Sequence, residues 1–152
     1  MKIVISKICC PIDFSDNSEH ALKYAIAFAQ AHNAALHLLH VVDIPVFASL
    51  DYPIMPHDIA DIAKNAQRKI DDILMETKQL HERVTTKVIM GKPFMEIIQY
   101  ARTEEVDLIV LGTHGSSGIA HALMGSVAER VVRKAPCPVL TIKHPEHEFI
   151  MP

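Results

Sequence analysis

The chain has 152 residues, of which 49% are hydrophobic and 22% are charged, and its formal net charge is −3. This length fits a single domain over residues 1–152 with a sizeable core, and this composition excludes an intrinsically disordered chain. Because lysine and arginine are dispersed along a weakly acidic chain, nucleic acid is not expected as a partner. No apolar run is long enough for a bilayer or a signal peptide, so we expect no membrane partner and a cytoplasmic location.

The first half of the chain alternates short apolar runs with helical patterns. An apolar run at 8–12 predicts a strand, and a capping-box pattern at 16–19 predicts the start of a helix that ends near Asn33. A second, buried strand is expected at 34–42. The segment 43–56 holds three prolines and no sustained period, so it predicts a connecting loop.

The second half continues this alternation. Apolar residues recur at helical spacing over 57–74, a third strand is expected at 84–90, and Pro93 suits the first turn of the next helix. A strand, a glycine-rich loop, a short helix and a last strand then follow, at 106–111, 112–125, 126–134 and 138–142. This order predicts a Rossmann-like α/β fold, in which a parallel sheet lies between two layers of helices as a three-layer α/β/α sandwich.

Four of the five glycines lie in the loop that follows the fourth predicted strand. In an open parallel sheet, ligands bind outside the carboxyl ends of the strands, where the strand order reverses. The glycine loop and Asp13 both follow such an end, so they border one crevice if the first and fourth strands are neighbours. The loop lacks the lysine of a Walker loop, and its glycines at 112, 115 and 118 do not have the dinucleotide-binding spacing.

The spacing Gly112-x2-Gly115-x9-Gly125-Ser126 resembles the nucleotide-binding signature of the universal stress protein family. The resemblance extends to Pro11-Ile-Asp-Phe-Ser, His40-Val-Val-Asp and the closing Ala135-Pro-Cys-Pro-Val-Leu. It implies a five-stranded parallel sheet in the order 3-2-1-4-5. It also implies ATP as the ligand, with ADP and AMP as alternatives and with Mg²⁺ or Mn²⁺ held mainly through the phosphates.

The resemblance further implies which residues contact the nucleotide. Asp13 is expected at the ribose or adenine, with Pro11 and Ile12 beside it, and the backbone of Val41 is expected at the adenine. The loop is expected to face the ribose and phosphates with Gly112, Thr113, His114 and Gly115. The phosphate tail is expected against Gly125, Ser126 and Val127.

Elementary chemistry supports a phosphate role for this loop. Glycine lets backbone amides approach phosphate oxygens, and a helix that begins near Ser126 offers unpaired N–H groups, so no lysine is required. The segment 116–122 carries no cation, with the exception of His121 if it is protonated. The alternatives are a structural turn without a ligand, and ordinary helix-capping roles for Asp13 and Ser126.

Ten histidines and three cysteines invite a metal or redox hypothesis, but their spacing does not support one. No Cys/His pattern fits a structural zinc site, and His37 and His40 should face opposite sides of a strand, so we expect solvent or edge histidines and no metal site. Cys9 and Cys10 are expected as small buried residues. No nucleophile elbow is present, so no catalytic residue is assigned.

These observations favour an ATP-binding, nucleotide-dependent stress-response switch or sensor. The loop lacks the groups that rapid phosphoryl transfer requires, so any ATP hydrolysis is expected to be slow. The alternatives are a slow ATP-hydrolysing enzyme and a nucleotide-independent dimeric interaction module. The family resemblance and an apolar edge strand imply a homodimer through Val139, Leu140, Thr141 and Ile142, beside an unidentified protein partner. Residues 144–152 are expected to form a flexible or dimer-contacting tail.

Overall fold

The computed structural model describes residues 3–43, 55–76, 83–115 and 124–143. Most of the expected connecting loop, the central part of the glycine loop with Gly118 and His121, and the expected tail at 144–152 lie outside the described residues. The ends of the glycine loop, which carry the predicted site residues, lie within them.

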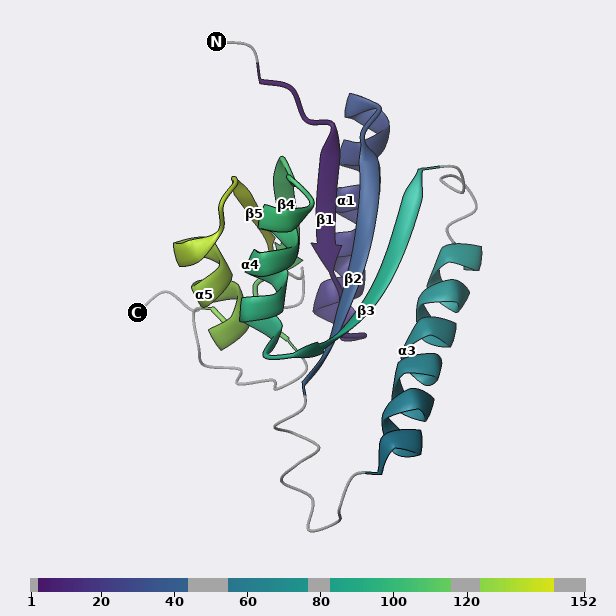
Figure 1. Cartoon of the computed structure of the whole chain (residues 1–152). Helices are drawn as coiled ribbons and strands as arrows, with labels where there is room; N and C mark the ends of the chain where they lie inside the picture. The colour runs from purple at the N-terminus through teal and green to yellow at the C-terminus, as the bar shows by residue number, and fades with distance from the viewer. Residues whose placement is uncertain (1–2, 44–54, 77–82, 116–123, 144–152) are drawn as a thin grey trace.

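Five parallel strands form one sheet in the order β3-β2-β1-β4-β5 (Figure 1), which confirms the predicted strand order. The strands are β1 (Lys7–Pro11), β2 (Ala35–Asp43), β3 (Val84–Gly91), β4 (Leu108–Gly112) and β5 (Val139–Ile142). In this register, Ile8 of β1 lies between Leu36 of β2 and Leu108 of β4. Strand β1 is therefore the central strand of the sheet, with β2 and β3 on one side and β4 and β5 on the other.

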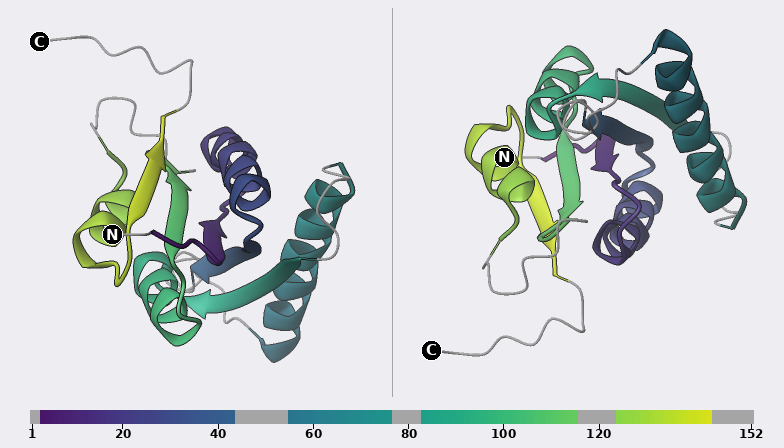
Figure 2. Two further views of the ribbon diagram at one scale, coloured as in Figure 1. Left: turned by 90° about the horizontal axis from the view of Figure 1, so that it is seen from above. Right: turned by 90° about the horizontal axis from the view of Figure 1, so that it is seen from below.

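Helices cover both faces of the sheet, which confirms the predicted three-layer architecture. One face packs against α1 (Asp16–His32) and α3 (Pro56–Glu76), and the other against α4 (Pro93–Thr103) and α5 (Ser126–Lys134) (Figure 2). Within the described ranges, no helix combines the length and apolar character needed to cross a lipid bilayer.

The start of α1 differs from the predicted capping box by one residue. Ser15 is the N-cap, and its Oγ accepts a hydrogen bond of 3.3 Å from the N–H of Ser18, whereas Asp16 already lies inside the helix. Asp16 and Glu19 lie in the first turn, where carboxylates interact favourably with the helix dipole. The predicted end is confirmed, because Asn33 caps the helix in the left-handed conformation at φ 54°.

The two helices on the other face begin in different ways. Pro93 occupies the first turn of α4, as predicted. Helix α5 has Gly125 as its N-cap, so the alternative interpretation of Ser126 as the capping residue is wrong. The N–H of Gly125 donates to the Thr113 carbonyl at 2.7 Å, which fixes Gly125 just before the helix. Ser126 is consequently the first helical residue, and it is exposed.

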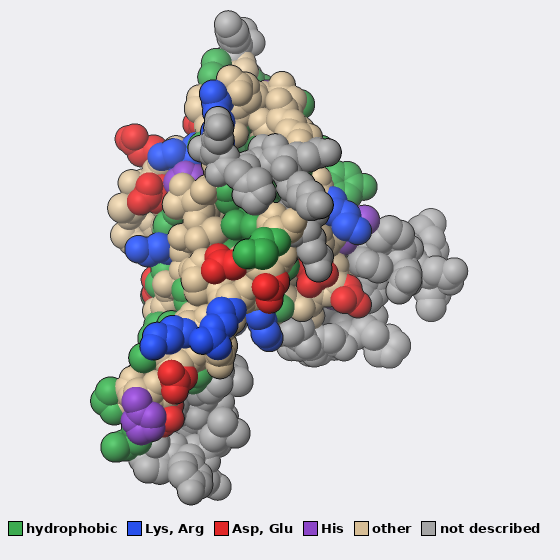
Figure 3. All heavy atoms as spheres, turned by 90° about the vertical axis from the view of Figure 1, so that its right-hand side faces the viewer, with side chains coloured by type: hydrophobic (Ala, Val, Ile, Leu, Met, Phe, Trp, Pro, Cys, Tyr) green, Lys and Arg blue, Asp and Glu red, His purple; other side chains and the backbone are tan. Residues whose placement is uncertain are grey.

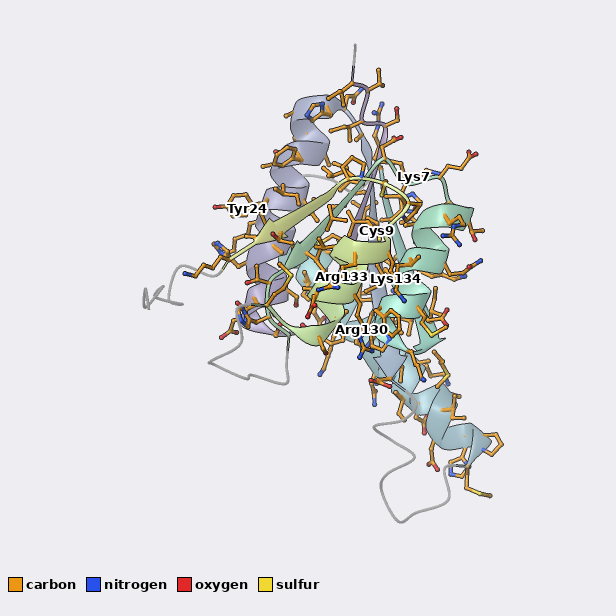
Figure 4. The ribbon with its side chains drawn as sticks, turned by 90° about the vertical axis from the view of Figure 1, so that its left-hand side faces the viewer. Lys7, Cys9, Tyr24, Arg130, Arg133 and Lys134 are labelled. Carbon is orange, nitrogen blue, oxygen red and sulfur yellow. The ribbon has the colours of Figure 1, made fainter. Side chains whose placement is uncertain are left out.

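The core consists of two apolar clusters, one on each side of the sheet. Ile8 and Cys10 face α1 and α3, whereas Cys9 lies under α4 and α5 (Figure 4). Both cysteines are fully buried, which confirms their predicted packing role, and burial raises the pKa of the Cys10 thiol to about 12 and that of Cys9 well above its usual value. Burial on both faces explains why β1 has no alternation of apolar and polar residues.

Candidate functional site

Asp13 and the glycine loop meet at the carboxyl ends of β1 and β4. These strands are neighbours, and a Cβ atom added to Gly115 would lie 2.8 Å from Oδ2 of Asp13. Asp13 and Gly115 are therefore in direct proximity, although about a hundred residues separate them in the sequence. The strand order reverses at this point, because β1 is followed by β2 on one side and has β4 on the other.

Hydrogen bonds fix the Asp13 side chain and backbone. Its Oδ1 accepts from the N–H of Ser15 at 3.1 Å and from the Ser15 hydroxyl at 2.5 Å, while its own N–H donates to Oγ of Ser18 at 3.3 Å. Asp13 thus supports the capping residue Ser15 and does not cap the helix itself. One carboxylate oxygen faces the start of α1 and the other faces the glycine loop.

The next residue, Phe14, has a left-handed backbone conformation at φ 62°. Such a conformation is uncommon for an aromatic residue, and strain of this kind persists only where neighbouring contacts maintain it. The Phe14 ring packs on the ring of His40 with 4.4 Å between centroids, and Nζ of Lys69 lies 5.1 Å from its centroid. Lys69 belongs to α3, whose side of the molecule carries both basic and acidic side chains (Figure 3).

His40 is a half-buried residue of β2, an inner strand, that contacts this turn, and not the solvent or edge histidine that the sequence led us to expect. Its Nδ1 lies 2.8 Å from the carbonyl oxygen of Ile12. Because a carbonyl only accepts, Nδ1 carries the hydrogen. Burial lowers the pKa of His40 from 6.5, and Lys69 lowers it further, whereas the Ile12 carbonyl and Asp13 act in the opposite direction.

His37 corrects the same expectation on the opposite face of β2. It is only 7% exposed, and its Nδ1 lies 2.8 Å from the hydroxyl of Tyr100 in α4. Burial is the main reason that its pKa lies below 6.5, with Lys7 adding to the effect and Glu104 opposing it. The prediction that His37 and His40 face opposite sides of the strand is confirmed.

Packing within the protein leaves little room for a side chain at the described glycines of the loop. A Cβ atom on Gly112 would lie 2.9 Å from the carbonyl oxygen of Asn17, and one on Gly125 would lie 3.2 Å from that of Thr113. A Cβ atom on Gly125 would also lie 3.6 Å from the main-chain nitrogen of Gly115. The two described ends of the loop are therefore packed against each other. Packing within the protein, which is the structural alternative to a ligand, explains why glycine occupies some of these positions.

The remaining predicted residues lie around the same edge of the sheet. Thr113 is buried, and its Oγ1 lies 3.0 Å from Nδ1 of His114. Pro11 ends β1, Ile12 is buried, and Val127 lies in the first turn of α5. The side chain of Val41 packs on the α4 and α5 side, away from Phe14 and His40.

Four residues around Asp13 and the glycine loop were not identified as site residues from the sequence: Phe14, Asn17, His40 and Lys69. Phe14 and His40 belong to the motifs Pro11-Ile-Asp-Phe-Ser and His40-Val-Val-Asp, but the sequence analysis assigned site roles only to other residues of these motifs. Asn17 and Lys69 carry no local signal, since their positions depend on how α1 and α3 pack. The Asn17 Oδ1 atom is buried and lacks a hydrogen-bond partner among the described residues. Within the same residues, no group of three or more His, Cys, Asp or Glu side chains is arranged to hold a metal ion.

Comparison with known proteins identifies relatives over almost the whole chain. The sequence model of the Universal stress protein family matches residues 5–143. Universal stress protein MJ0531 of Methanocaldococcus jannaschii is 36% identical over 143 residues, which cover 93% of this chain and 84% of the relative. The solved structure of MJ0577 is 31% identical, with a TM-score of 0.83, and the match covers 95% of this chain and 99% of that one.

Two further solved structures share the fold and contain an adenine nucleotide. A universal stress protein in complex with cAMP has a TM-score of 0.64 at 24% identity, over 91% of this chain and 97% of that one. A universal stress protein from Archaeoglobus fulgidus in complex with dAMP has a TM-score of 0.62 at 22% identity, over 93% of this chain and all of the other. At this level of identity, both comparisons establish the fold.

The lowered pKa values of His37 and His40 predict that stability falls in mild acid. Their folded-state pKa values lie below the value of 6.5 expected in the unfolded chain, so the unfolded chain binds more protons near that pH. Their contribution is therefore present above pH 6.5 and is lost as the pH falls through the folded-state values. The free energy of unfolding, measured with urea between about pH 7.5 and 5.5, should decrease less steeply in His37→Phe and in His40→Asn. Equal pH dependence in all three proteins would contradict this assignment.

Proposed function

The chain belongs to the universal stress protein family, and from this premise we propose that it is an ATP-binding, nucleotide-dependent stress-response switch or sensor. One observation carries the proposal, namely the proximity of Asp13 and Gly115 at the carboxyl ends of two adjacent parallel strands. Nucleotides bind at this position in open α/β sheets. The cAMP and dAMP complexes of proteins with this fold support an adenine nucleotide as the ligand class.

The described residues fit the chemistry of such a ligand. In this proposal, the Asp13 carboxylate accepts a hydrogen bond from the ribose or adenine beside Pro11 and Ile12, and the Val41 backbone contacts the adenine. The phosphates lie on the backbone from Gly112 to Gly115 and from Gly125 to Val127, where α5 presents its N-terminal N–H groups. A bound Mg²⁺ or Mn²⁺ would neutralise phosphate charge and would be held mainly by the phosphates.

The same geometry favours a switch over a fast enzyme. Among the described residues of the loop, 112–115 and 124–125, there is no lysine or arginine to stabilise charge on a transferring phosphoryl group. The Asp13 carboxylate is engaged by Ser15 at the start of α1. Backbone amides that bind the ground-state phosphates do not by themselves lower the barrier. The cytoplasmic location, the tail at 144–152 and the unidentified protein partner stay predictions.

We propose further that two copies pair through β5. Within the described part of the chain, β5 pairs only with β4 and forms one edge of the sheet. The carbonyls of Pro138 and Ile142 accept from Ile109 and Thr113, so alternate residues of β5 face β4. The N–H and C=O groups of Val139 and Thr141 consequently point outward, where a second copy of the strand can pair with them.

Substitution of Asp13 tests the nucleotide site. Asp13→Asn keeps an oxygen that can accept from Ser15 but removes the charge, so adenine nucleotide affinity should fall by about tenfold or more. Calorimetric titration with ATP, ADP, AMP and cAMP gives the affinities. The matched control is Asp16→Asn, three residues later on the exposed surface of α1, which should bind as the unmodified protein does. Failure of the unmodified protein to bind any of the four nucleotides would leave the nucleotide-independent interaction module as the function.

The switch proposal also predicts slow turnover. With magnesium and saturating ATP, steady-state phosphate release should stay below about 1 per second, the low end of typical enzymes. The measurement is made on the same protein whose ATP occupancy has been determined by titration. Faster release that Ser126→Ala abolishes would establish the enzyme alternative.

The pairing of β5 is tested at Thr141. Thr141→Pro removes the outward N–H and leaves the bonds to β4 intact, so it should convert a dimer into a monomer that keeps its fold. Thr141→Ala is the control, because it retains the N–H and should stay dimeric. Light scattering at micromolar concentration gives the mass, and a monomeric unmodified protein would refute the dimer.

A further inference from the structure

We propose that His40 is the positioning residue of the candidate nucleotide site. Its side chain holds the turn from Ile12 to Ser15 in the conformation that presents the Asp13 carboxylate to the nucleotide. This inference rests on the proposed function for its ligand, but the contacts that carry it lie entirely within the described residues.

The first step concerns the peptide groups next to Asp13. The N–H of Ile12 donates to the carbonyl of Leu39 at 2.8 Å, and the carbonyl of Ile12 accepts from Nδ1 of His40 at 2.8 Å. Both partners belong to β2 and are adjacent in its sequence. The Ile12 residue, which is only 3% exposed, is therefore fixed on both sides by one strand. The orientation of the peptide that leads into Asp13 depends on the His40 bond.

The second step concerns the strained residue after Asp13. The left-handed conformation of Phe14 is maintained by contacts of its ring, and the His40 ring makes the closer of the two described ring contacts, at 4.4 Å compared with 5.1 Å for Lys69. His40 thus contacts the residues on both sides of Asp13. With Ile12 and Phe14 held in place, the Asp13 oxygens face Ser15 and Gly115.

The third step concerns the protonation state that this role requires. The groups that face His40 are the Ile12 carbonyl, the Asp13 carboxylate and the Phe14 ring from the turn, and Lys69 from α3. Burial and Lys69 lower the pKa of His40, so the neutral ring with its hydrogen on Nδ1 predominates above pH 6.5. This tautomer donates to Ile12 without placing a second charge next to Asp13.

The test separates the donated hydrogen bond from the packing of the ring. His40→Phe keeps a ring but loses the donor, whereas His40→Asn places an amide N–H where Nδ1 was and loses the ring. Calorimetric titration with ATP near pH 7.5 should show affinity about tenfold weaker for His40→Phe. His40→Asn should recover part of this loss, because it restores the donor to Ile12 but not the ring against Phe14, and a merely space-filling role would allow no recovery. If His40→Phe fails to fold, His40→Leu takes its place.

His37 supplies the matched control. It is a buried histidine of the same strand, but its Nδ1 bonds to Tyr100 on the opposite face. His37→Phe should therefore lose stability without losing affinity for ATP. The positioning role is overturned if His40→Phe binds like the unmodified protein, if His40→Asn is as weak as His40→Phe, or if His37→Phe weakens binding equally.

A second measurement does not depend on the nucleotide. The amide hydrogen of Asp13 is bonded to Oγ of Ser18, and that of Ser15 is bonded to Oδ1 of Asp13. Both should exchange faster in His40→Phe than in His40→Asn, and they should be unchanged in His37→Phe. If the unmodified protein binds no adenine nucleotide, the proposed function fails, and this exchange pattern still decides whether His40 orders the turn. Unchanged exchange in His40→Phe would overturn the inference.

Discussion

The parallel hydrogen bonding of β1 between β2 and β4 is the constraint on which the rest of the structure depends. Parallel pairing places every strand end of one kind at the same edge of the sheet, and the central position of β1 brings its end next to two other strands. The turn after β1 can therefore contact β2 through Ile12 and the glycine loop through Asp13. None of these contacts requires a long loop or a second domain.

Close packing around the Asp13 turn comes from three separate parts of the chain. The start of α1 binds one carboxylate oxygen, the glycine loop passes the other, and α3 brings a lysine over the neighbouring aromatic ring. A carboxylate that is already hydrogen-bonded in the absence of a ligand needs little reorganisation when one arrives. Under the proposed function, preorganisation of this kind would let a loop with few polar side chains form part of a specific site.

The sequence predicted the fold far better than the details of the site. Continuous apolar runs such as Leu108–Gly112 and helical periodicity depend on local pattern, so the strands, the helices and the Asn33 cap were predicted correctly. The burial of His37 depends on Tyr100, 63 residues away, and the surroundings of His40 depend on Lys69 from another helix. Local pattern holds no information about such partners. Gly112 illustrates the same limit, because its close neighbour Asn17 becomes visible only when α1 packs on β4.

The two adjacent cysteines of β1 have a consequence for oxidising conditions. Successive side chains of a strand point to opposite faces, so Cys9 and Cys10 lie in different cores with the sheet between them and cannot form a disulfide with each other. Their raised pKa values keep both sulfurs as thiols, which react with peroxide far more slowly than thiolates do. Cys137 is the one cysteine of the sequence with partial solvent exposure, and burial raises its pKa as well. Among the three cysteines of the folded protein, an oxidant in solution therefore has access only to Cys137, and the thiols of the central strand can react only where the sheet opens.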